Sequence, residues 1–290
     1  MSGPQCCSNP PTTNPSSGAG HLEQLAGLNS YITGSPDSKI AVILITDVFG
    51  YEAPLLRKLA DEVAAAGFFV VVPDFFKGDP YVPDDANRPI RVWFQDHEPD
   101  KSFDDGKAVI EALKSKGISA IGAAGFCWGA KVVVELSKVD LIQAAVLLHP
   151  SLVTVDDIKE IFPFWNMKVK EGCIKYTESD KKEESHINRL FLISCRIIIK
   201  IIFLLLSEAT TVKAPTSILG AEIDQISPPE LLKQFEEVLS TKPEVDGFVK
   251  IFPKVSHGWT VRYNVEDEEA VKRADEAQRD MLDWFTKYLK

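Results

Sequence analysis

From residue 39 onward, short apolar segments alternate with segments of helical periodicity, and this alternation restricts the possible folds more than any other feature. The apolar segments read KIAVILIT, FFVVVPDFF, ISAIGAAG, IQAAVLLH, TSILGAE and FVKIFP. Amphipathic segments separate them, and a long C-terminal helix is expected from about residue 266. Because continuously apolar strands are buried on both faces, the sequence predicts an α/β fold with a mostly parallel central sheet and helices on both faces.

Two regions depart from this alternation. Residues 1–30 include a stretch rich in Pro, Ser and Gly, which predicts a flexible N-terminal tail before a single domain at 31–290. An atypical insert at about 162–212 contains a charged stretch and then an apolar run at 190–206. Arg196 and Lys200 lie inside that run, so we expect no membrane span and favour a buried or surface segment.

Composition excludes several classes of partner. The net charge of −10 argues against binding to nucleic acid or an anionic membrane surface. The five cysteines show no disulfide framework and the N-terminus shows no signal pattern, which predicts a cytoplasmic protein with reduced thiols. We find neither a metal-ligand spacing nor a glycine-rich phosphate loop, and therefore expect no metal and no cofactor. The protein is expected to be a monomer or a small homo-oligomer.

Candidate functional residues follow the predicted strands, because active sites of such sheets lie at the carboxyl ends of the strands. The polar or nucleophilic residues at these positions are Asp47, Asp74, Cys127, His149, Asp224 and His257.

The segment Gly-Phe-Cys-Trp-Gly at 125–129 matches a nucleophile elbow, in which glycines allow a strained turn between a strand and a helix. Placement at a helix N-terminus favours the thiolate form of Cys127. Taken alone, the pentapeptide equally fits an inert cysteine buried in a tight junction. Both interpretations remain open at this point.

The order of the remaining candidates favours catalysis. A nucleophile, an acid and a histidine follow one another in this type of fold, and Asp224 and His257 fit that order after Cys127. His149 precedes the acid, so we interpret it as packing or pocket lining. His97 and His21 are interpreted as solvated loop residues.

These residues, together with DVFGYEAPLLRKLADEVAAAGFFVVVPDFFKGDP, GFCWGAK, ILGAEID and SHGW, resemble the dienelactone hydrolase family, most closely its plant members. The resemblance covers about residues 1–161 and 213–290 and implies an α/β-hydrolase fold. It implies that Cys127 is the nucleophile, His257 the general base and acid, and Asp224 the group that orients His257. The oxyanion hole would be formed by the backbone N–H groups of Val48 and Trp128.

Two features depart from the family pattern. Bacterial members carry a glutamate that modulates the thiol where this chain has Asp47, which is shorter by one methylene. Residues 162–212 have no family counterpart, and their bias toward Ile, Lys, Phe and Leu is typical of A/T-rich codons. We hypothesise that they derive from translated intron sequence or a gene-model error.

The resulting functional prediction is a cysteine-dependent hydrolase that acts on a small-molecule ester or lactone through a Cys-His-Asp triad and an acyl-enzyme. Two alternatives remain. Plant members often carry an endo-1,3;1,4-β-glucanase label, and glycoside hydrolysis would use carboxylates among Asp47, Asp74 and Asp224. If the insert displaces Asp224, the chain would instead be a non-catalytic binding protein.

Overall fold

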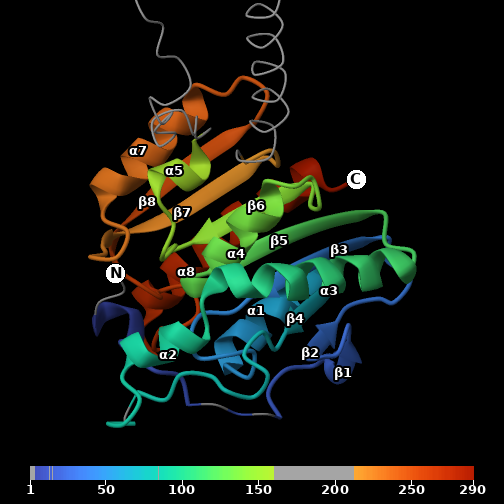
Figure 1. The fold of residues 1–290 in the computed structure, drawn as a ribbon, viewed down its shortest axis with the longest axis horizontal. Helices are drawn as coiled ribbons and strands as arrows, with labels where there is room; N and C mark the ends of the chain where they lie inside the picture. The colour runs from blue at the N-terminus through green and yellow to red at the C-terminus, as the bar shows by residue number, and fades with distance from the viewer. Residues whose placement is uncertain (1–3, 13, 15, 84, 160–211) are drawn as a thin grey trace, which may run out of the picture.

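The computed structural model describes residues 4–12, 14, 16–83, 85–159 and 212–290, which form an eight-stranded mixed sheet flanked by helices (Figure 1). The strands are β1 His21–Leu25, β2 Leu28–Thr33, β3 Ile40–Ile45, β4 Phe69–Pro73, β5 Ala120–Phe126, β6 Ala144–Leu148, β7 Thr216–Ile223 and β8 Gly247–Ser256. The α-helices are α1 Pro54–Ala65, α2 Ile90–Asp96, α3 Phe103–Ser115, α4 Trp128–Ser137, α5 Val155–Ile158, α7 Pro229–Ser240 and α8 Glu268–Tyr288. Two short 3-10 helices are η1 Pro4–Cys7 and η2 Pro99–Ser102.

The strand order is β1-β2-β4-β3-β5-β6-β7-β8. The six strands from β4 to β8 in this order pair in parallel, whereas β1 and β2 are antiparallel to their neighbours. The predicted mostly parallel sheet is confirmed. Its parallel strands direct their carboxyl ends to one edge, where the sequence places the candidate functional residues.

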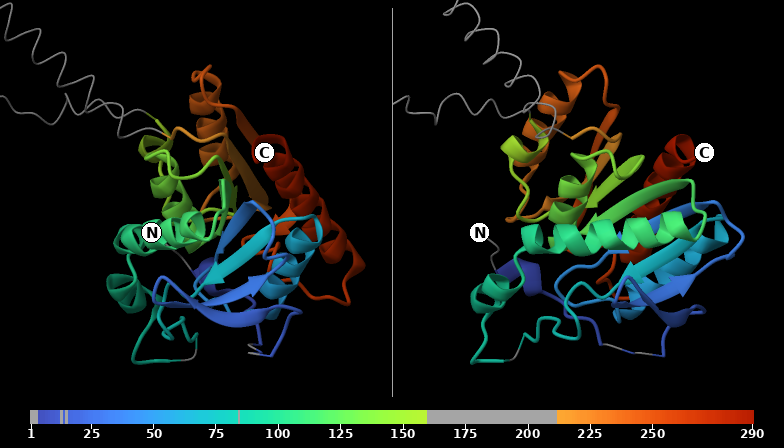
Figure 2. Two further views of the ribbon diagram at one scale, coloured as in Figure 1. Left: turned by 90° about the vertical axis from the view of Figure 1, so that its right-hand side faces the viewer. Right: turned by 45° about the vertical axis from the view of Figure 1, so that its right-hand side comes forward.

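Two hydrophobic cores cover the two faces of the sheet. On one face, alternate strand residues such as Ile43 pack with apolar residues of α3, α4 and α7. On the other face, Val42 and its equivalents pack with α1 and α8. Figure 2 shows α8 and α3 on opposite sides of the strands. Helices on both faces, as predicted, bury the central strands completely.

The N-terminal region differs from the predicted flexible tail. Within residues 1–30, η1 and β1 are formed, and β1 pairs with β2 as a hairpin. The two turn residues, Ala26 and Gly27, have φ angles of 53° and 81°, as a tight two-residue hairpin requires. The β1 strand HLEQL is largely exposed and mostly polar, so it lacks the apolar run by which the buried strands were recognised.

The polar, Pro-rich segment at 77–101, where the sequence shows no apolar strand or helical periodicity, contains α2 and the start of η2. Trp93 of α2 is buried and donates a hydrogen bond from Nε1 to the carbonyl oxygen of Asp79 at 3.0 Å. The proposed insert at 162–212 lies outside the described residues apart from Val212. Across the described ranges, every helix is too short or too polar to cross a membrane.

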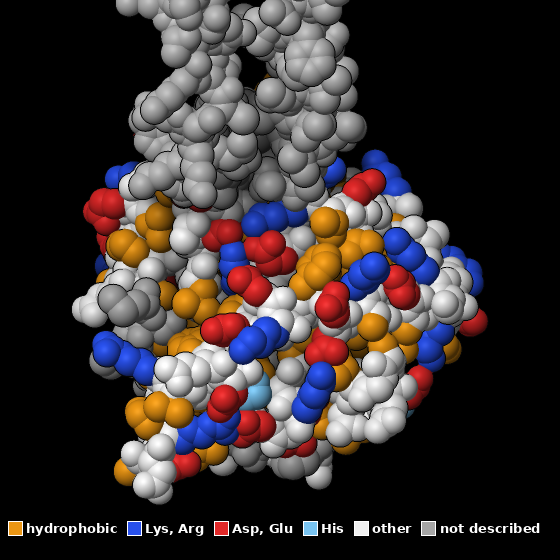
Figure 3. Space-filling model, in the orientation of Figure 1, with side chains coloured by type: hydrophobic (Ala, Val, Ile, Leu, Met, Phe, Trp, Pro, Cys, Tyr) orange, Lys and Arg blue, Asp and Glu red, His pale blue; other side chains and the backbone are white. Residues whose placement is uncertain are grey.

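Acidic and basic side chains are interspersed over the face shown in Figure 3. That distribution agrees with an acidic protein whose surface carries both signs of charge.

Candidate active site

Cys127 occupies a sharp turn between β5 and α4. Its φ of 51° and ψ of −108° are unusual for a residue with a side chain, and such strain is typical of functional sites. The flanking glycines permit the turn: a Cβ atom at Gly125 would lie 2.4 Å from the carbonyl oxygen of Gly129, and one at Gly129 would lie 2.2 Å from that of Ile45. The geometry is therefore that of a nucleophile elbow.

Asp224 and His257 meet at the carboxyl ends of β7 and β8. Oδ2 of Asp224 lies 2.8 Å from Nδ1 of His257, and both side chains are fully buried. The other carboxylate oxygen, Oδ1, accepts hydrogen bonds from the backbone N–H groups of Ile226 and Ser227. This second set of bonds fixes the orientation of the carboxylate beside the imidazole.

The remaining ring nitrogen of His257 points to sulfur. Nε2 is buried and forms no hydrogen bond to any part of the chain that the structure describes. A ring nitrogen of His257 lies within 4.8 Å of the sulfur atoms of Cys127 and Cys6. Because Nδ1 faces Asp224, Nε2 is the nitrogen available to the Cys127 thiol.

The pKa values of Cys127 and His257 shift in opposite directions. Burial favours the neutral forms, but a hydrogen bond from Cys6 and the positive charge of His257 hold the pKa of Cys127 well below its usual range. Burial also lowers the pKa of His257, yet the negative charge of Cys127 and the Asp224 hydrogen bond raise it to about 9. Both shifts favour the ion pair of a thiolate and an imidazolium over the neutral pair.

His149 lies beside this pair as a neutral ring. Its centroid is 5.0 Å from that of His257, and its Nε2 is 2.8 Å from Oγ1 of Thr260. Burial and the positive charges of His257 and Arg262 hold the pKa of His149 well below its usual range. His149 therefore packs against the catalytic candidates, in agreement with its interpretation as a packing residue.

Asp47 forms an ion pair with an arginine. Its Oδ2 lies 3.1 Å from Nε of Arg262, and both side chains are buried. Oδ1 accepts a hydrogen bond from the backbone N–H of Phe49, which bends the loop after β3. Sequence analysis did not identify Arg262, because no local pattern links residues 215 positions apart.

The amides proposed for the oxyanion hole belong to that loop and to the elbow. Val48 follows β3, and Trp128 is the first residue of α4. Within the part of the chain that the structure describes, the backbone N–H groups of Val48 and Trp128 donate no hydrogen bond to another backbone group. Both residues are buried near the strand ends.

A second thiol reaches the site from the N-terminus. Cys6 of η1 places its sulfur 3.3 Å from that of Cys127, and both residues are fully buried. Ser151, which follows β6, lies on another side, with its Oγ 3.5 Å from the Cys127 sulfur. Neither contact was predicted. Among the residues that the structure describes, the sulfur atoms of Cys6 and Cys127 and a ring nitrogen of His257 lie within 4.8 Å of one another. They are close enough to hold a soft cation.

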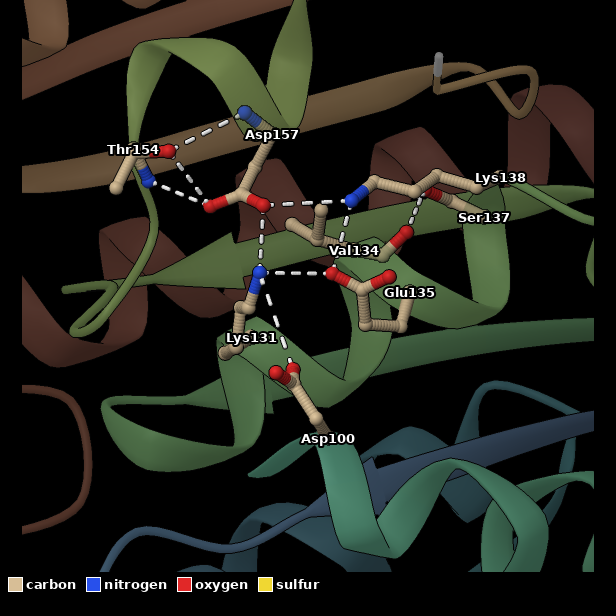
Figure 4. Close-up of polar contacts among 8 residues, drawn as sticks. All are labelled: Asp100, Lys131, Val134, Glu135, Ser137, Lys138, Thr154 and Asp157. Atoms are coloured by element: carbon tan, nitrogen blue, oxygen red, sulfur yellow. Dashed lines mark hydrogen bonds and ion pairs between the residues drawn. The ribbon is translucent and has the colours of Figure 1, made fainter. Parts of the chain in front are cut away.

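An ionic cluster fixes α4, the helix that begins at the elbow (Figure 4). Lys131 of α4 and Lys138, the residue that follows α4, both contact Oδ1 of Asp157, at 2.5 Å and 3.3 Å. Asp157 also closes a capping box with Thr154 at the start of α5. The same carboxylate thus connects α4 to α5.

Of the histidines expected to be solvated, His21 is exposed, as predicted. His97 differs. Its ring is half-buried, with Nε2 2.9 Å from Oδ2 of Asp79, and its carbonyl oxygen accepts a hydrogen bond from Nε1 of Trp128. It therefore links the loop before α3 to the elbow helix.

Comparison with known proteins identifies the family. The sequence profile of the dienelactone hydrolase family matches residues 28–163 and 204–289. An endo-1,3;1,4-beta-D-glucanase from Zea mays is 45% identical over 168 residues, which are 54% of this chain and 52% of that protein. The chain therefore aligns with about half the length of that relative.

Two further matches extend over nearly the whole chain. A carboxymethylenebutenolidase homolog from Xenopus tropicalis is 27% identical over 275 residues, covering 93% of this chain and 91% of that protein. The crystal structure of a dienelactone hydrolase described as putative, from Klebsiella pneumoniae, aligns with a TM-score of 0.58 at 16% identity, over 90% of this chain and 93% of that one. The chain has the α/β-hydrolase fold and belongs to the dienelactone hydrolase family, whose members are hydrolases of the ester or lactone type.

Proposed function

We propose that this protein hydrolyses small esters or lactones through a covalent acyl group on Cys127. One observation carries the proposal. The Asp224 carboxylate holds Nδ1 of His257 at 2.8 Å, which leaves the buried Nε2 for a sulfur on a strained elbow at a helix N-terminus. Such an arrangement generates a nucleophile and keeps a proton beside it.

In the first half-reaction, the Cys127 thiolate attacks the acyl carbon and forms a C–S bond. The backbone N–H groups of Val48 and Trp128 hold the oxyanion, and each such donor stabilises a transition state by about 3 kcal/mol in comparable sites. The C–O bond of the ester then breaks, and the departing alkoxide takes the proton from Nε2 of His257.

In the second half-reaction, neutral His257 removes a proton from water, and the resulting hydroxide attacks the thioester. The C–S bond breaks, which returns the thiolate and the imidazolium. The Asp224 carboxylate accepts the hydrogen bond from Nδ1 throughout, so that Nε2 always faces the reacting atoms.

A trapped intermediate tests the assignment. Incubation with an activated ester, followed by peptide mapping by mass spectrometry, is expected to find the acyl group on Cys127. Cys127→Ala should abolish both the adduct and steady-state turnover, whereas the matched variant Cys7→Ser should retain them. An acyl group on another residue would overturn the role of Cys127.

Glucan cleavage is the second candidate, because the relative from Zea mays carries an endo-1,3;1,4-beta-D-glucanase name. The strand-end carboxylates, however, already have partners. Asp47 faces Arg262, Asp224 faces His257, and Asp74 accepts hydrogen bonds from Phe76 and Gly78. Release of reducing sugar from mixed-linkage glucan that persists after Cys127 alkylation and disappears in Asp74→Asn would favour this candidate.

The remaining alternative is a binding protein without catalytic activity. Cys127 precedes residues 160–211 and His257 follows them, yet the cysteine sulfur lies within 4.8 Å of a ring nitrogen of His257. Together with the short contact between Asp224 and His257, this proximity supports catalysis over that alternative. Turnover of any small ester that depends on Cys127 would exclude it.

A further inference from the structure

The N-terminal segment brings a second thiol into contact with the proposed nucleophile. The sulfur atoms of Cys6 and Cys127 are 3.3 Å apart, and both residues are fully buried. A disulfide bond is about 2.05 Å long, so a shift of roughly 1.3 Å would bring the two atoms to bonding distance. Nothing in the chemistry of ester hydrolysis requires this second thiol.

Specific contacts hold Cys6 in place. The side-chain amide of Gln5 donates to the carbonyl oxygen of Ile223 at 2.7 Å and accepts from the backbone N–H of Gln225 at 2.6 Å. Nη1 of Arg262 donates to the carbonyl oxygens of Cys6 and Ser8 at 2.8 Å and 2.7 Å. These contacts fix η1 against both the Asp224 loop and the segment that follows His257.

We propose that Cys6 and Cys127 form a reversible disulfide when the protein meets hydrogen peroxide or another small hydroperoxide. Cys6 would then protect Cys127 from irreversible oxidation. The inference goes beyond hydrolysis, because the bond would form whether or not Cys127 attacks esters.

The reaction proceeds in two steps. The Cys127 thiolate attacks one peroxide oxygen, so that an S–O bond forms, the O–O bond breaks, and the departing hydroxide takes a proton from His257 to become water. The sulfur of Cys6 then attacks the sulfenic acid, so that the S–S bond forms and the S–O bond breaks. The oxygen leaves as a second water with the Cys6 proton. Two thiols are oxidised by two electrons, and one peroxide is reduced to two waters.

The ionisation of the two thiols fits this order of events. His257 and the hydrogen bond from Cys6 hold the pKa of Cys127 well below its usual range, so Cys127 reacts first. The pKa of Cys6 is raised, above all because its thiol donates to Cys127. Cys6 therefore stays protonated until Cys127 has been oxidised.

Cys7 provides a matched control. It is adjacent to Cys6 and half-buried, and its thiol interacts with the thiol of Cys6 and with Tyr81 at the edge of the site. Substitution of Cys7 by serine preserves the pair of sulfur atoms that carries the inference. Substitution of Cys6 by serine removes one of them.

The test uses the full chain, treated with hydrogen peroxide, alkylated, digested with trypsin without reduction and analysed by mass spectrometry. The expected product joins peptide 1–39 to peptide 117–131, which contains Cys127. This cross-link should be present in the unsubstituted chain and in Cys7→Ser, absent from Cys6→Ser, and lost after dithiothreitol. Cys6→Ser should instead accumulate sulfinic acid on Cys127.

Three results would overturn the inference: a cross-link that persists in Cys6→Ser, a bond between Cys6 and Cys7, or sulfinic acid on Cys127 while Cys6 remains a free thiol. Because the readout is a covalent bond, the outcome is independent of esterase activity. If Cys127 forms the cross-link but never an acyl adduct, the proposed hydrolysis fails and the disulfide stands.

Discussion

The pKa of His257 is raised despite its burial because negative charge faces both of its ring nitrogens. Asp224 contacts Nδ1, and the Cys127 thiolate lies on the side of Nε2. Neither charge would be stable in this position alone, since burial disfavours both. The two residues must therefore be considered as one titrating unit.

This coupling predicts the pH dependence of hydrolysis. The proton on Nε2 is needed for the leaving alkoxide, and the pKa of His257 is raised to about 9. Hydrolysis of an alkyl ester, measured as kcat/KM, should be constant around neutral pH and fall as the pH rises through about 9. On the acid side, activity should persist well below the usual thiol pKa, because that of Cys127 is lowered. An alkaline limb near pH 6.5 would contradict the ion pair.

Substitution of the orienting acid should separate geometry from charge. Asp224→Asn keeps the size of the side chain but presents a neutral group to Nδ1, so the imidazolium loses stabilisation and its tautomer is no longer fixed. We expect kcat/KM to fall by about 10²- to 10⁴-fold and the alkaline limb to move to lower pH. The control Asp74→Asn changes another strand-end acid, whose partners are backbone N–H groups, and should retain both the rate and the profile.

At the level of elements, the elbow depends on how closely α4 approaches β3. A Cβ atom at Gly129 would lie 2.2 Å from the carbonyl oxygen of Ile45 and 2.7 Å from that of Thr46, and a backbone contact of this kind is not relieved by a side-chain rotation. A side chain at this position would therefore push α4 away from the end of β3, at the turn that holds Cys127. The glycine is therefore required for the position of the nucleophile as well as for folding.

Gly129→Ala should lower the free energy of unfolding by about 3 kcal/mol or more, as measured by urea denaturation. Gly106→Ala is the matched control, because Gly106 lies inside α3 and its added Cβ would meet only the flexible side chain of Leu136 at 3.2 Å. Alanine is favoured in a helix interior, so this control should be neutral or more stable. Equal losses in the two variants would contradict the close approach at the elbow.

The ionic cluster at Asp157 also predicts an effect on the free energy of unfolding. Asp157→Ala removes the carboxylate half of the α5 capping box and leaves Lys131 and Lys138 without this partner, which should lower the free energy of unfolding by about 2 kcal/mol. Glu62→Ala, which breaks an exposed pair with Lys58, should change it by less than about 0.5 kcal/mol.

The same cluster predicts how the contribution of Asp157 to stability changes with pH. Although burial opposes ionisation, the lysines and the Thr154 amide lower the pKa of Asp157. A carboxylate with a lowered folded-state pKa stabilises the fold above its unfolded value, near 4, and loses this effect as the pH falls through the folded value. The difference in stability between the unsubstituted chain and Asp157→Ala should therefore shrink on acidification.

For the whole molecule, the sequence predicted the parallel strands and their helices because burial on both faces leaves a continuous apolar run. It failed at β1, which is polar and exposed, and at α2, which lies in a Pro-rich loop. Cys127, Asp224 and His257 were identifiable because each follows a recognisable strand. Cys6 was not, since a contact between residues 121 positions apart has no local signature.

Residues 164–203, which the family profile leaves unmatched, lie between the elbow and the strand that carries Asp224. Outside them, β6 pairs directly with β7, and the backbone N–H of Lys213 donates to the carbonyl oxygen of Ser137 at 2.9 Å.

Replacement of 164–203 by a short Gly-Ser linker should thus preserve the fold and the esterase rate, because changing loop length costs only about 0.6 kcal/mol per doubling. Circular dichroism and turnover of the two proteins provide the comparison. An inactive deletion variant would show that these residues contribute to the site, and abundant transcript reads through their codons would contradict an intron origin.

The placement of η1 over Cys127 also has a kinetic consequence. A substrate that approaches the Cys127 sulfur from the side of Cys6 would compete with a segment of the same chain. The effective concentration of such a segment is set by its tether and can reach the millimolar range for short flexible connections. Dilution does not weaken such a competitor. The Michaelis constant would then reflect the fraction of molecules in which η1 has left the site as well as the fit of the ester, since apparent affinity scales with the population able to bind. Selectivity among esters would then be decided after that departure.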